Sequence, residues 1–428
     1  MDKLKDRRCK WCGIVYSYTE SWQKNVRKIS ISLQVFLRDK QRRLIRSASR
    51  PRTAVATMPS WRIYLTLALA VGTAAAARLK VSGKDLTYNG QKVFLNGCNI
   101  AWHNYGYDFG NGGYDGTLEQ WLREIGGSGG NSIRVWVHVE GYSTPRWDSN
   151  GYVTQCDQSG TFEADVKKLL DAAQAADVLV VLVLWNGAYL TNQAAVNLIW
   201  DDAKLDAYIN NCLNSLVTQV KGHPALGAFE VVNEPEGSIL VSSDSEPCYD
   251  TTTIGQSGAG WTGLYIPMER YRKDYFSSRD HTVSFLTPRF AVPPPGQFAQ
   301  SDAFSNTHNH YTDECLNKAA GGSNAHLDFF QIHAYDWGDP GAQRAFTVDA
   351  DAYGLGKPVV LGEYASVCGA GTSLPDLYSY AYEHGYSGGW SWHYVATGEC
   401  SDTRQQQQEA LKTLKDRSDH GLVSFPVG

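Results

Sequence analysis

The sequence predicts an α/β fold, a (β/α)8 TIM barrel with a short N-terminal β-hairpin covering one end. Apolar, β-branched segments of strand length recur at intervals of roughly 45 residues, and patterns typical of amphipathic helices lie between them. Continuously apolar strands are characteristic of a parallel sheet that is buried on both faces. The 428 residues, 43% hydrophobic and 19% charged, are enough for one large core and exclude a wholly disordered chain.

The elements follow in order along the chain. Residues 85–94 read as two short strands around Asn89-Gly90, the strongest local signal for a hairpin. The barrel strands are then expected at 93–99, 132–138, 178–185, 227–233, 327–335, 358–363 and 386–393. The gap between 233 and 327 has double length, so the fifth strand is placed inside it, at 281–286.

Helices are expected between the strands, most clearly at 161–176 and 203–220, where apolar residues recur at spacings of three and four. The alternative is a doubly wound open sheet. That fold is disfavoured because no GxGxxG pattern follows an early strand.

The N-terminal region divides into two parts ahead of the barrel domain at 78–428. Residues 58–77 have a positive start, a short apolar run and small residues, as in a secretory signal peptide, so a secreted, extracellular protein with no membrane attachment after cleavage is expected. Residues 1–57 then read as a basic extension, disordered or an artefact of the gene model, with translation starting at Met58. The alternatives are an uncleaved membrane anchor with a basic tail, and half of a zinc site at Cys9 and Cys12.

Charge and aromatic content limit the chemical class of the binding partner. Residues 1–57 carry 15 basic against 4 acidic residues, whereas 58–428 carry 24 basic against 40 acidic ones. An acidic body does not suit nucleic acid. The 13 Trp and 24 Tyr favour stacking on a flat, neutral ligand such as a sugar.

Seven cysteines follow the expected cleavage site, and an exported protein is expected to form two or three disulfides with them. The odd count leaves one thiol, for which Cys98 in an apolar strand is the candidate. A bond between Cys368 and Cys400 would join two late loops.

Two glutamates end apolar strands four and seven, where barrel enzymes carry their working groups. Glu234 follows Val231-Val232-Asn233, and Glu363 follows Val359-Val360-Leu361-Gly362. Either glutamate alone reads more simply as a solvated loop residue. Together, among aromatic residues, they suit cleavage of a glycosidic bond, which needs one carboxylic acid and one carboxylate.

Asn233-Glu234-Pro235 and Gly362-Glu363, with Arg134 and His333-x-Tyr335, resemble glycoside hydrolase family 5, and most closely the endo-β-1,4-mannanases of molluscs and similar invertebrates. The resemblance runs from about residue 78 to about 427. It includes the motifs that begin at Asn99, Leu184, Gly260 and His308.

The resemblance implies a retaining mechanism with Glu234 as acid/base and Glu363 as nucleophile. It also implies that Asn233 binds the 2-hydroxyl of the sugar, that Tyr335 holds Glu363 and that His333 lines the pocket. Arg134 beside Glu363 is expected to keep that carboxylate ionised, and the nearby negative charge is expected to keep a proton on Glu234.

Further substrate contacts are expected from aromatic and amide side chains at strand ends. Trp392 and, as an alternative, Trp390 would stack on a sugar, since residues two apart on a strand share a face. Trp102, Trp185 and Asn186 are further candidates for substrate contact, and Trp136 and Trp261 are assigned to the core. Neither a metal nor another cofactor is required, and His308 to His310 read as a hydrogen-bonded loop.

Residues 271–299 depart from the family pattern, with Pro293-Pro294-Pro295 in place of the expected helix and strand.

The function indicated is a secreted, monomeric endo-β-1,4-mannanase acting on mannan, glucomannan or galactomannan. The alternatives are an endo-β-1,4-glucanase with the same mechanism, and a carbohydrate-binding barrel without catalysis.

Overall fold

The structure is a computed structural model, and it describes residues 78–188, 190–252, 264, 266, 285–286, 309–320, 325–335 and 345–428. The predictions for the extension at 1–57, for the signal peptide at 58–77 and for nearly all of 271–299 lie outside these residues, as do Trp261 and His308. Within the described part, no helix is long and apolar enough to cross a membrane.

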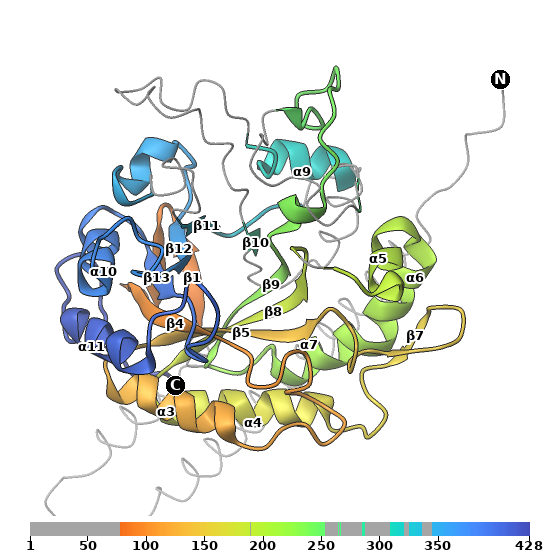
Figure 1. Ribbon diagram of the computed structural model, residues 1–428, viewed down its shortest axis with the longest axis horizontal. Helices are drawn as coiled ribbons and strands as arrows, with labels where there is room; N and C mark the ends of the chain where they lie inside the picture. The colour runs from red at the N-terminus through yellow and green to blue at the C-terminus, as the bar shows by residue number, and fades with distance from the viewer. Residues whose placement is uncertain are drawn as a thin grey trace, which may run out of the picture. The chain divides into compact units, whose positions relative to one another are not determined.

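Within the described residues, eight strands form one sheet, and all of its seven strand pairings are parallel. The hydrogen-bonded order is β10-β11-β12-β13-β4-β5-β8-β9, so β13, the last strand of this sheet along the chain, pairs with β4, its first, and the sheet curls (Figure 1). The two ends of this ladder, β9 and β10, lie next to each other. This is the strand order of a (β/α)8 barrel, and the predicted fold class is confirmed.

The strands lie close to their predicted positions. Seven of them are β4 (Leu95–Ala101), β5 (Ser132–Val139), β8 (Leu179–Asn186), β9 (Leu226–Asn233), β11 (Phe330–Ala334), β12 (Val359–Tyr364) and β13 (Gly388–Ser391). The fifth strand in chain order, β10, comprises Phe285–Leu286 and pairs with β11, which confirms the end of the predicted segment 281–286.

The N-terminal hairpin lies at the amino ends of the barrel strands. It consists of β2 (Asp85–Tyr88) and β3 (Gln91–Lys92), as predicted, and β1 (Leu79–Ser82) pairs with β2 as a third strand that the sequence analysis did not predict. Asn89 and Gly90 have φ values of 52° and 77°, the positive values that a type I′ turn requires. The hydroxyl of Tyr88 donates to the carbonyl of Pro224, just before β9, so the hairpin is fastened to one end of the barrel as predicted.

Helices cover the outside of the curled sheet (Figure 1). Within the described residues they are α3 (Thr117–Gly127), α4 (Phe162–Ala175), α5 (Gln193–Trp200), α6 (Asp202–Tyr208), α7 (Asn214–Val220), α9 (Asp313–Ala320), α10 (Leu374–Glu383) and α11 (Arg404–Leu414). Val166, Leu169 and Leu170 of α4 are fully buried, as their spacing predicts.

The single helix predicted at 203–220 is instead three segments. A π-helical turn, η1 (Ile209–Leu213), separates α6 from α7. Its Cys212 is bonded to Cys156, which lies just after the short hairpin of β6 (Arg146–Trp147) and β7 (Val153–Gln155).

Two further disulfides join Cys248 to Cys315 and Cys368 to Cys400, while Cys98 is a buried free thiol. The number of disulfides, the pairing of Cys368 and the free Cys98 are therefore confirmed. Each bond crosslinks segments that lie 32 to 67 residues apart in the chain.

Candidate active site

Arg134 on β5 is the centre of a buried polar cluster inside the barrel. Its side chain is fully buried, and all five of its N–H groups donate hydrogen bonds. The acceptors are the two carboxylate oxygens of Glu230 at 2.7 and 2.5 Å, Asn99 and Asn233 at 2.8 Å each, and Glu363 at 2.7 Å. One guanidinium thus fixes side chains from β4, β9 and β12 relative to one another.

Glu363 is held by a separate donor on each oxygen. Arg134 donates to Oε1 at 2.7 Å, and the hydroxyl of Tyr335 donates to Oε2 at 2.9 Å. Burial raises the pKa of Glu363 above its ordinary value, and the charge of Glu234 acts in the same direction, whereas His333, Arg134 and Tyr335 lower it. Arg134 therefore acts in the expected direction, but burial outweighs it.

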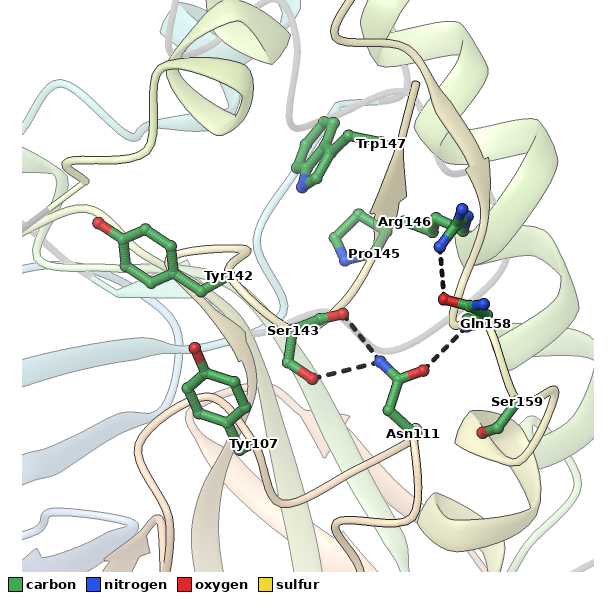
Figure 2. A pocket seen from close by; sticks show the side chains of 9 residues that line it. All are labelled: Tyr107, Asn111, Tyr142, Ser143, Pro145, Arg146, Trp147, Gln158 and Ser159. Carbon is green, nitrogen blue, oxygen red and sulfur yellow. Dashed lines mark hydrogen bonds between the residues drawn. The ribbon is translucent and has the colours of Figure 1, made fainter. Parts of the chain in front are cut away.

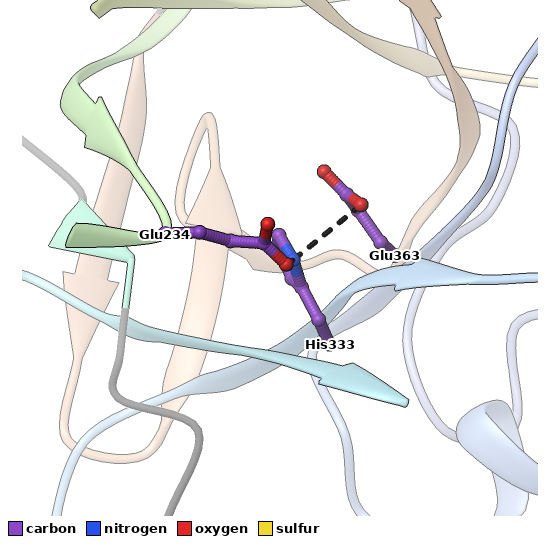
Figure 3. Close-up of side chains that lie close together, drawn as sticks. All are labelled: Glu234, His333 and Glu363. Carbon is purple, nitrogen blue, oxygen red and sulfur yellow. Dashed lines mark hydrogen bonds and ion pairs between the residues drawn. The ribbon is translucent and has the colours of Figure 1, made fainter. Parts of the chain in front are cut away.

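Glu234 follows β9 directly and has a φ of 43°, in the left-handed region that side chains other than glycine rarely adopt. The carboxylate of Glu234 lies beside the side chains of His333 and Glu363 (Figure 3). Its Oε1 lies 2.8 Å from Nδ1 of His333, and the same nitrogen lies 3.4 Å from Oε2 of Glu363. Oxygens of the two glutamates lie within 4.8 Å of each other, the close spacing of retaining rather than inverting glycosidases.

Asn233 is positioned by hydrogen bonds at both ends of its amide. Its oxygen accepts from Arg134, and its nitrogen donates to the oxygen of Asn186 at 3.0 Å. Asn186 in turn donates to the hydroxyl of Tyr105 at 3.3 Å. Asn186, which is buried like Asn233, therefore supports the orientation of Asn233, and its own contact with substrate stays a prediction.

The four candidate tryptophans separate into two pairs. The prediction of Trp390 as a stacking surface is wrong, because this ring is fully buried and its N–H donates to Ser132 at 2.9 Å. Trp185 is also a core residue, since it is 2% exposed and packs against His138 and Tyr208.

Trp392 and Trp102 remain candidates for stacking. Both are half-buried, and their ring centroids lie 5.8 Å apart. Trp392 packs against the cluster that contains Tyr335, which places it beside the hydrogen-bond donor of Glu363. Trp136, assigned to the core from the sequence, is 4% exposed.

Sequence reasoning missed two residues of this cluster, Glu230 and Asn99. Both are fully buried, and Glu230 is the counter-ion of Arg134. The available signal was a charged residue in the middle of an otherwise apolar strand, since such a carboxylate requires a buried cationic partner.

Glu234, His333 and Glu363 are also close enough to share a metal ion. Both oxygens of Glu363 already accept hydrogen bonds from Arg134 and Tyr335, however, an arrangement that suits a carboxylate positioned for reaction. Of the segment 308–310, read from the sequence as a hydrogen-bonded loop, the structure describes residues 309 and 310, and Nδ1 of the buried His310 lies 3.2 Å from the carbonyl of Cys248.

Comparison with known proteins identifies the family. The sequence is 43% identical over 361 residues to a mannan endo-1,4-β-mannosidase of Cryptopygus antarcticus, covering 82% of this chain and 94% of the relative. It is 40% identical to the mannan endo-1,4-β-mannosidase of Mytilus edulis, covering 84% of this chain and 99% of the relative. No protein-family model matches the sequence.

Solved structures agree with these relatives. The fold matches the crystal structure of the β-1,4-D-mannanase from Cryptopygus antarcticus with a TM-score of 0.74 at 39% identity, covering 82% of this chain and 99% of that one. It matches the endo-1,4-β-mannanase from Eisenia fetida with a TM-score of 0.75 at 38% identity, covering 82% of this chain and 100% of that one. The resemblance drawn from the motifs is thereby confirmed, and the chain belongs to the mannan endo-1,4-β-mannosidase family.

Proposed function

We propose that this protein is a secreted endo-β-1,4-mannanase that cleaves internal mannosidic bonds of mannan, glucomannan or galactomannan with retention of configuration. The observation that carries this proposal is the pair Glu234 and Glu363, with carboxylate oxygens within 4.8 Å of each other in a cluster organised by Arg134. The names of its relatives indicate mannan as the substrate.

In the first step, Glu363 attacks the anomeric carbon and forms a glycosyl ester. Glu234 donates its proton to the glycosidic oxygen as the bond to the leaving chain breaks. Arg134 and Tyr335 each hold one oxygen of Glu363, so the nucleophile enters the reaction already oriented.

In the second step, water attacks the anomeric carbon while Glu234 takes a proton from that water, and the bond to Glu363 breaks, which releases the sugar and restores the Glu363 carboxylate. Glu363 is uncharged while it is esterified, so the repulsion that favours a proton on Glu234 is absent in this step. The carboxylate of Glu234 is then available as the general base. The neighbouring His333, 2.8 Å away, orients Glu234 in both steps.

Asn233 is assigned to the 2-hydroxyl of the sugar at the cleavage point, because Arg134 and Asn186 hold its amide in a fixed orientation. Trp392 and Trp102 are assigned to stacking on sugar rings. The reaction as proposed uses these side chains and water, and needs no cofactor.

Secretion is supported by three disulfides, which are typical of proteins in oxidising compartments, together with the signal-like segment at 58–77. A monomer is proposed as well, since the side chains of the proposed mechanism form a complete set within one barrel. N-terminal sequencing of the secreted protein tests the proposed secretion, and an N-terminus near Arg78 is expected.

The test of function measures the release of reducing ends from linear β-mannan by the wild type, Glu234→Gln and Glu363→Gln. Each variant is expected to lose at least about 10³-fold in kcat, because one of the two catalytic groups is removed while its shape is kept. Proton NMR of the first product is expected to show the β-anomer. The α-anomer would contradict retention, and activity on carboxymethylcellulose without activity on mannan would make the protein a glucanase.

A further inference from the structure

An open cavity of about 690 Å³ lies beside the loops that follow β4 and β5. These loops leave the carboxyl ends of their strands, the side on which barrel enzymes bind their substrates. The volume falls within the range of roughly 300–1,000 Å³ that is usual for small-molecule sites. The reaction proposed above uses none of the residues that line it.

Aromatic rings form one part of the lining. Tyr107 is 53% exposed and Tyr142 is 54% exposed, and both lie on the same side of the cavity (Figure 2). Trp147 borders it as well, and its indole N–H donates to the carbonyl of Gly141 at 2.9 Å, which fixes the ring. Single exposed aromatic residues are common, but three around one hollow provide surfaces for stacking on sugar rings.

Polar groups form the opposite part of the lining (Figure 2). Arg146 donates to Oε1 of Gln158 at 2.7 Å, and Asn111 donates to the carbonyl of Ser143 at 3.0 Å. Arg146 is the one charged residue among the nine described residues around the cavity. Amide, hydroxyl and guanidinium groups facing aromatic rings suit a neutral ligand rich in hydroxyl groups.

The wall of the cavity is held in place without a ligand. The carboxylate of Asp157 accepts from the backbone N–H groups of Asn111 at 2.9 Å and Thr161 at 3.2 Å. The adjacent Cys156 is bonded to Cys212. A wall that is already ordered does not lose conformational entropy on binding, which favours a binding role.

Side-chain hydrogen bonds connect the cavity to the active site. From Asn233 and Asn186, contacts continue through Tyr105, Glu140 and Thr191 to the hydroxyl of Tyr142. The cavity and the catalytic glutamates therefore belong to one continuous face of the barrel.

We propose that this cavity is a distal subsite that binds a neutral hexopyranose unit of the mannan chain, away from the bond that is cleaved. The inference rests on the proposed function, which supplies the substrate. It predicts that residues of the cavity affect long substrates and leave short ones unaffected.

The test compares wild type, Tyr107→Ala and Tyr107→Phe on manno-oligosaccharides of three to six units and on linear mannan. Tyr107 is half exposed and lies outside the hydrogen-bonded connection, so its replacement leaves the fold intact. Tyr107→Ala is expected to lower kcat/KM on linear mannan by about 5- to 20-fold, because one stacking surface is lost. Activity on the shortest oligosaccharide that the wild type cleaves stays unchanged, and Tyr107→Phe retains wild-type values.

Equal losses on short and long substrates, or no loss on any of them, would overturn the proposal. A loss on galactomannan without a loss on linear mannan would also overturn it, because the bound sugar would then be a branch unit and not a unit of the main chain. If the wild type cleaves no mannan, the proposed function fails by itself. Affinity electrophoresis in gels with mannan then still tests whether the cavity binds this polysaccharide. Equal retardation of wild type and Tyr107→Ala would contradict binding there.

Discussion

Arg134 and His138 lie four residues apart on β5 and are both fully buried, yet their surroundings keep Arg134 charged and His138 neutral. Burial by itself lowers the pKa of Arg134, but Glu230 and Glu363 outweigh it and raise the pKa above its ordinary value. His138 packs against Phe162, Trp185 and Tyr208, and burial lowers its pKa to about 3.

The comparison teaches that the neighbours decide whether a buried basic group carries a charge. Around Arg134, two carboxylates and two amides accept every N–H group, so the ion is stable inside the barrel. Around His138, aromatic rings offer no compensation and the imidazole stays neutral. The charged region orients Glu363, the proposed nucleophile, whereas the neutral region is part of the scaffold.

The largest effect is expected from Arg134→Lys. An ammonium has three donors in place of five and cannot bind Glu230 in a bidentate manner, so buried acceptors lose their partners. We expect kcat on mannan to fall at least about 100-fold and the protein to lose about 3–5 kcal/mol of stability. Initial rates and urea unfolding measure the two effects.

The matched control is Arg123→Lys on α3, whose side chain is 60% exposed and pairs with Glu119. A change within about 0.5 kcal/mol is expected there, because exposed ion pairs contribute little. If Arg134→Lys behaved like this control, the dependence of the cluster on the five donors would be refuted.

An intermediate effect is expected from Tyr335→Phe. In the wild type, the hydroxyl of Tyr335 donates to Glu363 and lowers its pKa, so removal of this hydroxyl raises the pKa of Glu363 further. The proposed mechanism requires Glu363 in its ionised form, so on acidification the variant should lose activity at a higher pH than the wild type. The acidic limb of kcat/KM should move up by about one pH unit, and kcat should fall about 10-fold.

Tyr386→Phe is the control for this shift, since Tyr386 is also buried but donates to the backbone carbonyl of Ala345. Its acidic limb should coincide with that of the wild type. A shift of equal size in both variants would mean that the limb reports on general stability rather than on Glu363.

The sequence predicts the barrel and the two glutamates because both depend on local patterns, namely apolar strands and the residues that end them. It misses Glu230, since a strand pattern does not reveal which buried charge meets Arg134 across the barrel. Trp390 and Trp392 show a second limit. Spacing by two residues predicts a shared face but not depth, and depth decides that Trp390 is buried against Ser132. The cavity at Tyr107 and Tyr142 depends on loop conformation, which has no periodic signal.

The smallest effect concerns His138 and appears in the pH dependence of stability. In the folded protein its pKa is about 3, whereas an unfolded histidine has a pKa of about 6.5. Above about pH 6.5 the residue is neutral in both states, and as the pH falls below that value the unfolded chain gains a proton that the folded chain does not. The free energy of unfolding should therefore drop on acidification, by about 2 kcal/mol at pH 5 from this residue.

His138→Phe removes that contribution, so the difference in unfolding free energy between pH 7 and pH 5 should shrink by the same amount. The loss of the contact with Thr144 affects both pH values equally and cancels in the difference. His326→Phe, at a side chain that is 57% exposed, should leave the difference at the wild-type value. An unchanged difference in His138→Phe would show that this histidine is protonated inside the fold, and the contrast with Arg134 would then be lost.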